Sequence, residues 1–283
     1  MTPGLFDHLE PKPSPPAGVT AASLCVLGSS SSGNCSAIVL PAGILLIDCG
    51  FSRRRTRTLL DAAGLADAPI LAVVLTHLDT DHANPSFLAS LPDDTPVFMH
   101  ARHLGRAERE GLLHHRTEPF RDDFSPAPGV HVRSILVAHD SLGAAAFRVH
   151  FDDGRGDLGY ATDLGRPTAE LADHLRGVGT LALECNYCPH LELASNRPDY
   201  LKQRIMGGSG HLSNEQSARL ARDIAPARRV VLLHLSRQCN TPDRAAAAHA
   251  GAPYELHIAQ PGAPTPILPL GTAASLPPAS VYA

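Results

Sequence analysis

The sequence has no tryptophan, and aromatic residues make up only 5% of its 283 residues. Lysine is also scarce, since only two of the 24 Lys and Arg residues are lysines. The formal net charge of −4 excludes a chain that is basic throughout and coats nucleic acid. With a hydrophobic fraction of 43%, a strongly acidic disordered chain is excluded as well. A chain of this length can form one domain with an ordinary hydrophobic core.

Long hydrophobic runs and targeting signals are missing too. No segment approaches the roughly 18 uninterrupted apolar residues of a membrane span. Residues 1–20 lack the basic and apolar regions of a secretory signal. The six cysteines are scattered, and the CxxC pair of Cys185 and Cys188 has no second pair at zinc-ribbon spacing. We interpret them as reduced thiols of a cytoplasmic protein.

Histidine, in contrast, is abundant, with 16 residues. It is the commonest metal ligand and the side chain whose charge changes nearest neutral pH. A histidine-rich, faintly acidic chain of one domain therefore favours a search for a metal site.

Apolar segments alternate with helical patterns along the middle of the chain. We expect a catalytic domain at residues 21–260, a Pro-rich N-terminal tail at 1–20 and a Pro- and Ala-rich C-terminal tail at 261–283. Helices are predicted at 53–66, 101–111 and 213–224, and a turn-rich loop at 28–34. Strands are predicted at 22–27, 36–40, 44–47, 70–75, 97–99, 130–137, 145–151, 158–162, 180–183 and 230–233. The mixture predicts an α/β sandwich.

The densest cluster of potential metal ligands is THLDTDH, at residues 76–82, directly after a predicted buried strand. Side chains two positions apart on an extended segment point the same way, so His77 and Asp79 could bind one ion. Asp81 and His82 follow the bend and would face a neighbouring position. A polar loop after a strand is the simpler alternative, but this combination of residue types favours metal binding.

Three further predicted strands end in a residue that could bind a metal. These residues are His139, Asp163 and His234. Any one of them alone would more often be a loop or core residue. Four strand ends that share the feature are what a site at one edge of a sheet requires. Two metals about 3.5–4 Å apart would be bound by about six or seven such ligands.

The order of the motifs resembles that of the metallo-β-lactamase superfamily, and in particular its YycJ/WalJ-like branch. The layout is also similar to that of ribonuclease Z-type phosphodiesterases. The motifs that carry the resemblance lie within residues 23–240 in the expected order. They are LGSSSSGN (27–34), LIDCG (46–50), THLDTDH (76–82), AHDS (138–141), ATDLG (161–165), LECN (183–186), RIMGGSGHLSN (204–214) and LLHLSRQCN (232–240).

This resemblance implies a four-layer αββα sandwich with a dinuclear metal site along one edge of the paired sheets. The residues at the family's ligand positions form two sets and a bridge. One metal would be held by His77, Asp79 and His139, and the other by Asp81, His82 and His234, with Asp163 between them.

Asp79 departs from the superfamily, which usually has histidine at this position of its first motif. An anionic oxygen ligand moves the preference of the site from Zn²⁺ toward Mn²⁺ or iron without excluding zinc. It also leaves room for the first metal to be weakly held. We expect two divalent ions, zinc or manganese, with iron as an alternative.

The same resemblance assigns the chemistry beyond metal binding. A phosphodiester needs a proton for its departing oxygen, and His211 would contact the scissile phosphate and act as the general acid. Glu184 would orient His211. Asp81 is also expected to be a catalytic residue. The alternative for His211 is a loop residue that precedes the helix beginning at Ser213.

Four residues are predicted to contact the substrate. Ser30 and Asn34 lie in the loop at 28–34, which would present backbone N–H groups to a phosphate or form only a flexible hairpin turn. Lys202 and Arg204 precede the loop that carries the general acid and could hold phosphate.

Two other polar segments receive more modest expectations. The basic run at 53–57 is interpreted as a solvated helix start, with a contact to a nucleic-acid backbone as the second reading. Asp48 ends a predicted strand, and we expect a structural, hydrogen-bonding role for it.

The resemblance implies a cytoplasmic, metal-dependent hydrolase of phosphodiester bonds, with DNA exonuclease activity as the leading hypothesis. Its partner would be nucleic acid, DNA in preference to RNA. One alternative is a small-molecule hydrolase acting on a lactone, thioester or β-lactam. Another is a di-iron oxidoreductase, although the 43 residues after Asn240 are too few for the flavodoxin-like domain of such proteins. A metal-free binding module is a further alternative, and the oligomeric state stays open.

Overall fold

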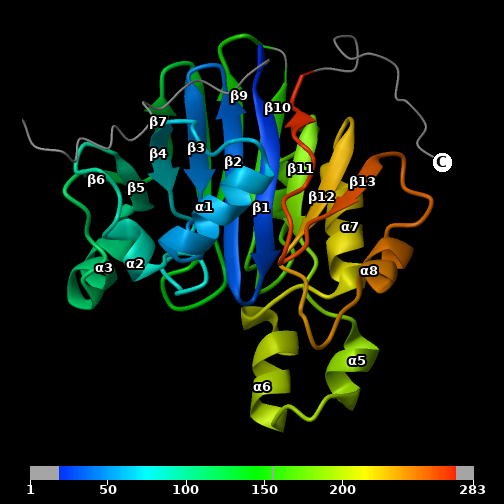
Figure 1. Cartoon of the computed structure of the whole chain (residues 1–283). Coiled ribbons are helices and arrows are strands. Elements are labelled where there is room, and N and C mark those ends of the chain that lie inside the picture. Colours follow the sequence, from blue (N-terminus) through cyan, green and yellow to red (C-terminus); the bar gives the residue numbers. More distant parts are fainter. Residues whose placement is uncertain (1–18, 155, 272–283) are drawn as a thin grey trace, which may run out of the picture.

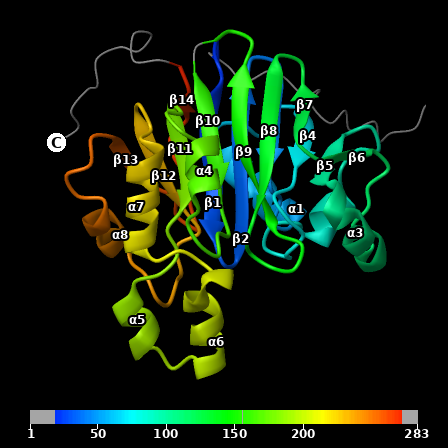
Figure 2. The same cartoon turned by 180° about the vertical axis from the view of Figure 1, so that it is seen from behind.

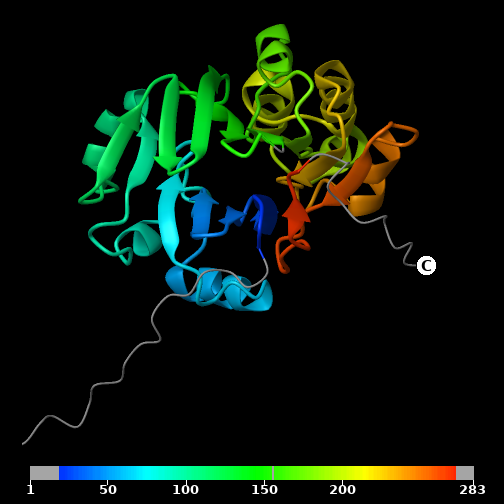
Figure 3. The same cartoon turned by 90° about the horizontal axis from the view of Figure 1, so that it is seen from above.

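The computed structural model describes residues 19–154 and 156–271. Two mixed β-sheets pack face to face and helices cover both outer faces (Figures 1 and 3). The predicted four-layer αββα sandwich is therefore confirmed. The first sheet has the strand order β14-β1-β2-β3-β4-β5-β6, and the second has the order β13-β12-β11-β10-β9-β8-β7.

The strands of the first sheet are β1 (Ser23–Ser30), β2 (Gly33–Leu40), β3 (Gly43–Ile47), β4 (Ile70–Val74), β5 (Val97–His100), β6 (Thr117–Phe120) and β14 (Leu268–Pro269). Those of the second sheet are β7 (Asp123–Ala127), β8 (Val130–Val137), β9 (Ala144–Phe151), β10 (Asp157–Ala161), β11 (Thr180–Glu184), β12 (Arg229–Leu233) and β13 (Glu255–Ile258). The α-helices are α1 (Arg53–Ala62), α2 (Pro85–Leu88), α3 (Leu104–Glu110), α4 (Ala169–His174), α5 (Pro189–Ala194), α6 (Asp199–Arg204), α7 (Asn214–Ile224) and α8 (Pro242–Ala248). A 3₁₀ turn, η1 (Ala101–His103), precedes α3, and a π-helical turn, η2 (Ile205–Ser209), follows α6.

The hydrophobic core has three layers, one between the two sheets and one on the outer face of each sheet. Apolar side chains of both sheets, such as Val26, Ile38 and Phe147, are buried between the sheets. Helices α1 to α3 close the outer face of the first sheet, while α4, α7 and α8 close that of the second (Figure 2). A strand that is covered on both faces has a continuous run of apolar residues. This is why β3, β11 and β12 could be recognised as strands from the sequence.

Parallel pairing within each sheet determines where the site can form. In the first sheet, β3 to β6 run parallel, and in the second, β10 to β13 do so. The carboxyl ends of parallel strands meet at the same edge of a sheet. The residues that follow β10, β11 and β12 are therefore brought together by the strand register.

The segment at 28–34 differs from the prediction of a long turn-rich loop. β1 continues to Ser30 and β2 begins at Gly33, so only two residues form the turn. Asn34 explains the extension, because its side-chain oxygen accepts hydrogen bonds from the Ser29 hydroxyl at 2.8 Å and the Ser30 amide at 3.1 Å. These side-chain bonds hold the two strands together up to the turn.

The C-terminal end of the described residues returns to the first sheet. β14 lies within the segment predicted as a C-terminal tail, but it pairs with β1, and Thr265 donates a backbone hydrogen bond to Val26. Part of that segment therefore belongs to the first sheet. Residues 1–18 and 272–283, the greater part of both predicted tails, lie outside the described residues.

Helices α5 and α6 form a helical hairpin that the sequence did not predict. The hairpin projects from one end of the sandwich (Figure 1). Its apolar residues form a small core of their own with Tyr187, Ile205 and Cys239. The longest helix among the described residues, α7, has 11 residues, so no helix of that part of the chain could cross a membrane.

Candidate metal centre

The loop after β4 places four of the predicted ligands close together. The backbone amides of His82 and Ala83 both donate to the Asp79 carbonyl, at 2.7 and 2.8 Å. This turn directs His77 and Asp79 to one position and Asp81 and His82 to the next, as the spacing suggested.

The first predicted set converges from two elements. The Oδ2 atom of Asp79 lies 3.8 Å from His77 Nε2 and 3.5 Å from His139 Nε2, and the two imidazole centroids are 4.9 Å apart. His139 enters from the loop after β8 of the opposite sheet. One ion could contact all three side chains.

The second predicted set lies beside the first. Asp81 Oδ2 is 3.8 Å from His82 Nε2 and 3.6 Å from Nε2 of His234, which follows β12. Asp163 lies between the sets, because its Oδ2 atom is 3.0 Å from His82 Nε2 and its Oδ1 atom is 4.0 Å from His139 Nε2. The strand ends thus bring together the residues of both predicted sets and the predicted bridge.

The donor atoms of this cluster suit a metal. His77 Nε2, His139 Nε2 and His234 Nε2 are buried without a hydrogen-bond partner among the described residues, while His234 Nδ1 lies 3.0 Å from Asp163 Oδ2. Buried polar atoms without a partner are costly, and a divalent cation between them would remove the cost. Burial lowers the pKa of His77 well below its usual value, with a contribution from His82. Despite burial, the adjacent carboxylates raise the pKa values of His82, His139 and His234, and a bound metal would take the place of the proton on these imidazoles. The His and Asp donors suit zinc, manganese or iron.

The backbone at the site is locally strained. Among the described non-glycine residues, only four have positive φ, and Asp48 (60°), Asp163 (54°) and His234 (55°) are three of them. Each follows the end of a strand. Such conformations cluster at functional sites because the surrounding structure enforces them. Here they turn the side chains toward one another.

Asp48 supports the second set as a structural residue, in the way the sequence predicted. Its carboxylate is fully buried and lies 2.7 Å from His82 Nδ1, and it accepts hydrogen bonds from the Thr76 amide and hydroxyl. Proton donation from Nδ1 to Asp48 leaves Nε2 of His82 for the metal position. Asn34 Nδ2 is also 2.9 Å from that Nε2 atom.

Arg106 supports the first set, although no motif in the sequence predicted a role for this residue. Its guanidinium donates to Asp79 Oδ1 at 2.9 Å and lies 3.5 Å from Asp140 Oδ2. Arg106 is in α3, far from the motif in sequence. The contact leaves Asp79 Oδ2 directed toward His77 and His139.

His211 and Glu184 form a close pair at the edge of the candidate centre. His211 Nδ1 is 2.6 Å from Glu184 Oε1, while Glu184 Oε2 accepts hydrogen bonds from the amides of Leu164 at 2.8 Å and Leu212 at 3.1 Å. Burial alone would raise the pKa of Glu184, but the adjacent His211 lowers it, so the carboxylate is charged. Asp163 Oδ1 is 3.7 Å from His211 Nδ1.

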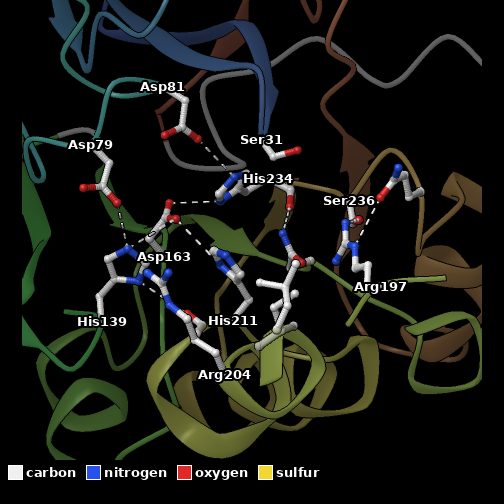
Figure 4. A pocket seen from close by; sticks show the side chains of 15 residues that line it. Ser31, Asp79, Asp81, His139, Asp163, Arg197, Arg204, His211, His234 and Ser236 are labelled. Carbon is white, nitrogen blue, oxygen red and sulfur yellow. Dashed lines mark hydrogen bonds and ion pairs between the residues drawn. The ribbon is translucent and has the colours of Figure 1, made fainter. Parts of the chain in front are cut away.

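A cavity of about 390 Å³ opens over these side chains. Figure 4 shows Asp79, Asp81, His139, Asp163, His211 and His234 around it. Arg197 and Arg204 of the helical hairpin region also line it, with Ser31 and Ser236. The cavity therefore contains both metal-type ligands and cationic side chains.

The four predicted substrate contacts differ in where the structure places them. Only Arg204 lines the cavity. Ser30 and Asn34 are buried behind Ser31, and Asn34 contacts His82. Lys202 donates to the Leu193 carbonyl at 2.9 Å, so it connects α6 to α5 rather than reaching the cavity.

Arg197 is a further cavity residue, and the sequence did not single it out. Its guanidinium bonds both carboxylate oxygens of Glu192, at 2.9 and 3.2 Å, and that carboxylate is fully buried. The arginines at 53–57 lie on α1, which covers the first sheet, and do not line the cavity.

Comparison with known proteins agrees with this architecture. The family model described as "Beta-lactamase superfamily domain" matches residues 44–235. The chain is 24% identical to the exodeoxyribonuclease YycJ of Bacillus anthracis over 259 residues, which cover 86% of this chain and 97% of that protein. It is also 24% identical to the exodeoxyribonuclease WalJ of Streptococcus pneumoniae serotype 2 over 234 residues, 78% of this chain and 84% of the relative.

Solved structures share the fold at lower identity. The metallo-β-lactamase fold protein YhfI of Bacillus subtilis has a TM-score of 0.63 at 16% identity. The match covers 86% of this chain and 99% of the YhfI chain. Zn²⁺-bound PqqB of Methylobacterium extorquens has a TM-score of 0.63 at 18% identity, with the same coverage. The sandwich, the converging strand-end ligands and the family match lead to one conclusion: the chain belongs to the metallo-β-lactamase superfamily of metal-dependent hydrolases, with the YycJ/WalJ proteins among its relatives.

Proposed function

We propose that this protein is a metal-dependent phosphodiesterase that degrades nucleic acid, as a DNA exonuclease. The observation that carries the proposal is the His211–Glu184 pair, 2.6 Å apart, at the edge of the candidate metal centre. Hydrolysis of a phosphodiester requires a proton for the departing oxygen, and a histidine held by a carboxylate is suited to supply it.

The residues proposed to hold two divalent ions are those of the two sets and the bridge described above. They are His77, Asp79 and His139, then Asp81, His82 and His234, and Asp163 between them. Two ions held there would supply an activated water and offset the charge of the phosphate. Zinc and manganese are the proposed metals, with iron as the alternative.

His211 has a defined orientation for its proposed role. Its Nδ1–H donates to Glu184, so Nε2 is the atom left to contact the departing oxygen. Glu184 holds the imidazole in this orientation, and the amides of Leu164 and Leu212 fix the carboxylate in turn. His211 is partly exposed in the cavity, with 21% of its side-chain surface accessible, so a substrate can reach it.

The substrate class is supported by charge and by relatives. Arg204 brings a cation to the cavity beside His211, where a phosphate chain would extend. The relatives YycJ and WalJ are named exodeoxyribonucleases, which favours DNA over RNA for this chain. We place the activity in the cytoplasm, where the six free, buried cysteines would stay reduced.

The test measures metal content and cleavage together. Metal-loaded wild type, His211→Ala and the control His131→Ala would be incubated with 5′- and 3′-labelled single-stranded DNA, duplex DNA and RNA, with Zn²⁺ or Mn²⁺. His131 lies at an exposed site on β8 and pairs with Asp152. We expect stepwise DNA products from wild type and His131→Ala, and a loss of about 10²- to 10⁴-fold in His211→Ala with unchanged metal content.

Two results would contradict the proposal. One is the absence of cleavage of every nucleic acid by the metal-loaded protein. The other is full activity of His211→Ala on a lactone, thioester or β-lactam, because a small-molecule hydrolase of this fold has less need of the His211–Glu184 pair.

A further inference from the structure

The helical hairpin of α5 and α6 carries an unusual amount of exposed apolar surface. Among the described residues, four large hydrophobic side chains are exposed, and the two most exposed are Tyr200 at 72% and Leu193 at 61%. Both lie on this hairpin, Leu193 in α5 and Tyr200 in α6. Clustered exposed hydrophobic side chains mark interaction sites more often than scattered ones do.

Tyr200 is placed next to the candidate centre by helix geometry. It precedes Arg204 by four residues in α6, and side chains at this spacing are neighbours on one helix face. Arg204 lines the cavity, and so does Leu201, the residue after Tyr200. The Cβ atom of Tyr200 therefore lies about one helical turn, roughly 5–6 Å, from the Cβ atom of this cavity-lining cation.

The hairpin holds this ring on a fixed base. Lys202 connects α6 to the end of α5 through the Leu193 carbonyl, and Arg197 connects the loop between the helices to the buried carboxylate of Glu192. Ile205, at the end of α6, packs with Tyr187 in the small core beneath. An aromatic ring that is exposed on a braced element loses little conformational freedom when a planar ligand stacks on it.

The charges around Tyr200 indicate which partner fits. Arg204, which lines the cavity, is a cationic group that matches a phosphate, and the aromatic ring matches a nucleobase. Proteins that bind single strands without reading their sequence combine aromatic rings for the bases with cations for the backbone. A base in the interior of a duplex is stacked on both faces and has no free face for such a ring.

We propose that Tyr200 is a stacking residue for an unpaired base of a single-stranded nucleic acid whose neighbouring phosphates contact Arg204 and the candidate metal centre. The inference rests on the proposed function and adds a preference for single-stranded substrate ends. Tyr200 acts as a binding residue and exchanges no proton with the substrate.

The experiment separates stacking from charge by salt dependence. A fluorescent phosphorothioate oligo(dT) strand, which resists cleavage, would be titrated with metal-loaded wild type, Tyr200→Ala, Tyr200→Phe and Arg204→Ala at several salt concentrations. We expect Tyr200→Ala to bind about fivefold to a hundredfold more weakly at every salt concentration, with the same slope against log salt. Arg204→Ala should reduce that slope by about 0.7, because one phosphate contact is lost.

Controls restrict the interpretation to the ring. Tyr200→Phe should bind like wild type, since stacking does not require the hydroxyl group. Leu113→Ala, which removes an exposed apolar side chain 47% accessible on a distant loop, should also bind like wild type. With a covalently closed circular duplex, which has no terminal base, Tyr200→Ala should differ from wild type by less than about threefold.

The inference is overturned if Tyr200→Ala binds the single strand like wild type, or if Tyr200→Phe binds as weakly as Tyr200→Ala. A loss equally large for the duplex would also overturn it. Failure of the proposed function is a different result, in which wild type neither binds nor cleaves any nucleic acid. A protein that cleaves DNA normally in the Tyr200→Ala form refutes only the stacking role.

Discussion

The two candidate ligand sets contain the same donor types but differ in what supports them. In the second set, the ligand-type His82 is held by a buried carboxylate, Asp48, at 2.7 Å. In the first set, the ligand-type Asp79 is held by a cation, Arg106, at 2.9 Å. A carboxylate behind a histidine makes the imidazole a stronger ligand, whereas an arginine on a carboxylate competes with the metal for its charge.

Because their supporting residues differ, the two candidate metal positions are not equivalent. Each has two imidazoles and one carboxylate, and Asp163 lies between them. Since Asp48 is completely buried and Arg106 is partly exposed, the support of the second set is also less screened by solvent. We therefore expect the metal at Asp81, His82 and His234 to be held tightly. The metal at His77, Asp79 and His139 should be held weakly.

Asp163→Asn should have the largest effect, because Asp163 is the residue proposed to bridge both positions. The amide preserves the shape and tolerates the left-handed backbone at this residue, where φ is 54°, but removes the negative charge. We expect activity to fall by about 10³-fold or more and both metals to bind more weakly, measured by DNA cleavage and elemental analysis. Loss of one metal with the other unchanged would show that Asp163 does not bridge the sets.

Asp48→Asn should weaken the second position selectively. The residue again has positive φ, 60°, and the substitution removes the charge behind His82 while keeping a polar side chain for Thr76. We expect about a 10- to 100-fold loss of affinity for the tighter metal, measured by competition with a chelating dye. A change confined to the weaker metal would reverse the assignment of the two positions.

Arg106→Gln should have the smallest effect and the opposite sign. Glutamine can still donate a hydrogen bond to Asp79 but carries no charge, so Asp79 becomes a better ligand. We expect affinity for the weaker metal to rise by about tenfold. Arg102→Gln is the matched control, since Arg102 is on the adjacent turn and donates to the Ser141 carbonyl rather than to a ligand-type residue. Weaker binding in Arg106→Gln would mean that Arg106 mainly orients the carboxylate.

Local patterns in the sequence predicted an α/β sandwich and the ligand-type residues at strand ends, whereas the four-layer arrangement and the two ligand sets came from the family resemblance. Apolar runs identified the central strands, and His77, Asp163 and His234 each follow such a run, so a shared sheet edge places them together. Asp48 was predictable in kind for the same reason. The resemblance supplied the pairing of His211 with Glu184, which no local pattern could have given.

The support of the site was not predictable, because it depends on contacts between distant segments. Arg106 lies 27 residues from Asp79 and resembles any other arginine of a polar helix. Asn34 was expected to face substrate, but its side chain is used within the fold, against Ser29 and His82. The short helices α5 and α6 have too few residues for a clear periodic pattern, so the hairpin with Arg197 and Tyr200 was missed.

The most direct test of the unequal centre is a chelator titration of the purified protein, with bound metal and DNA cleavage followed together. We expect two divalent ions per chain to leave in two separate steps, with activity lost in the first step. In Arg106→Gln, the first step should shift to a higher chelator concentration. Release of both ions in one step, or a stoichiometry of one ion or none, would contradict it.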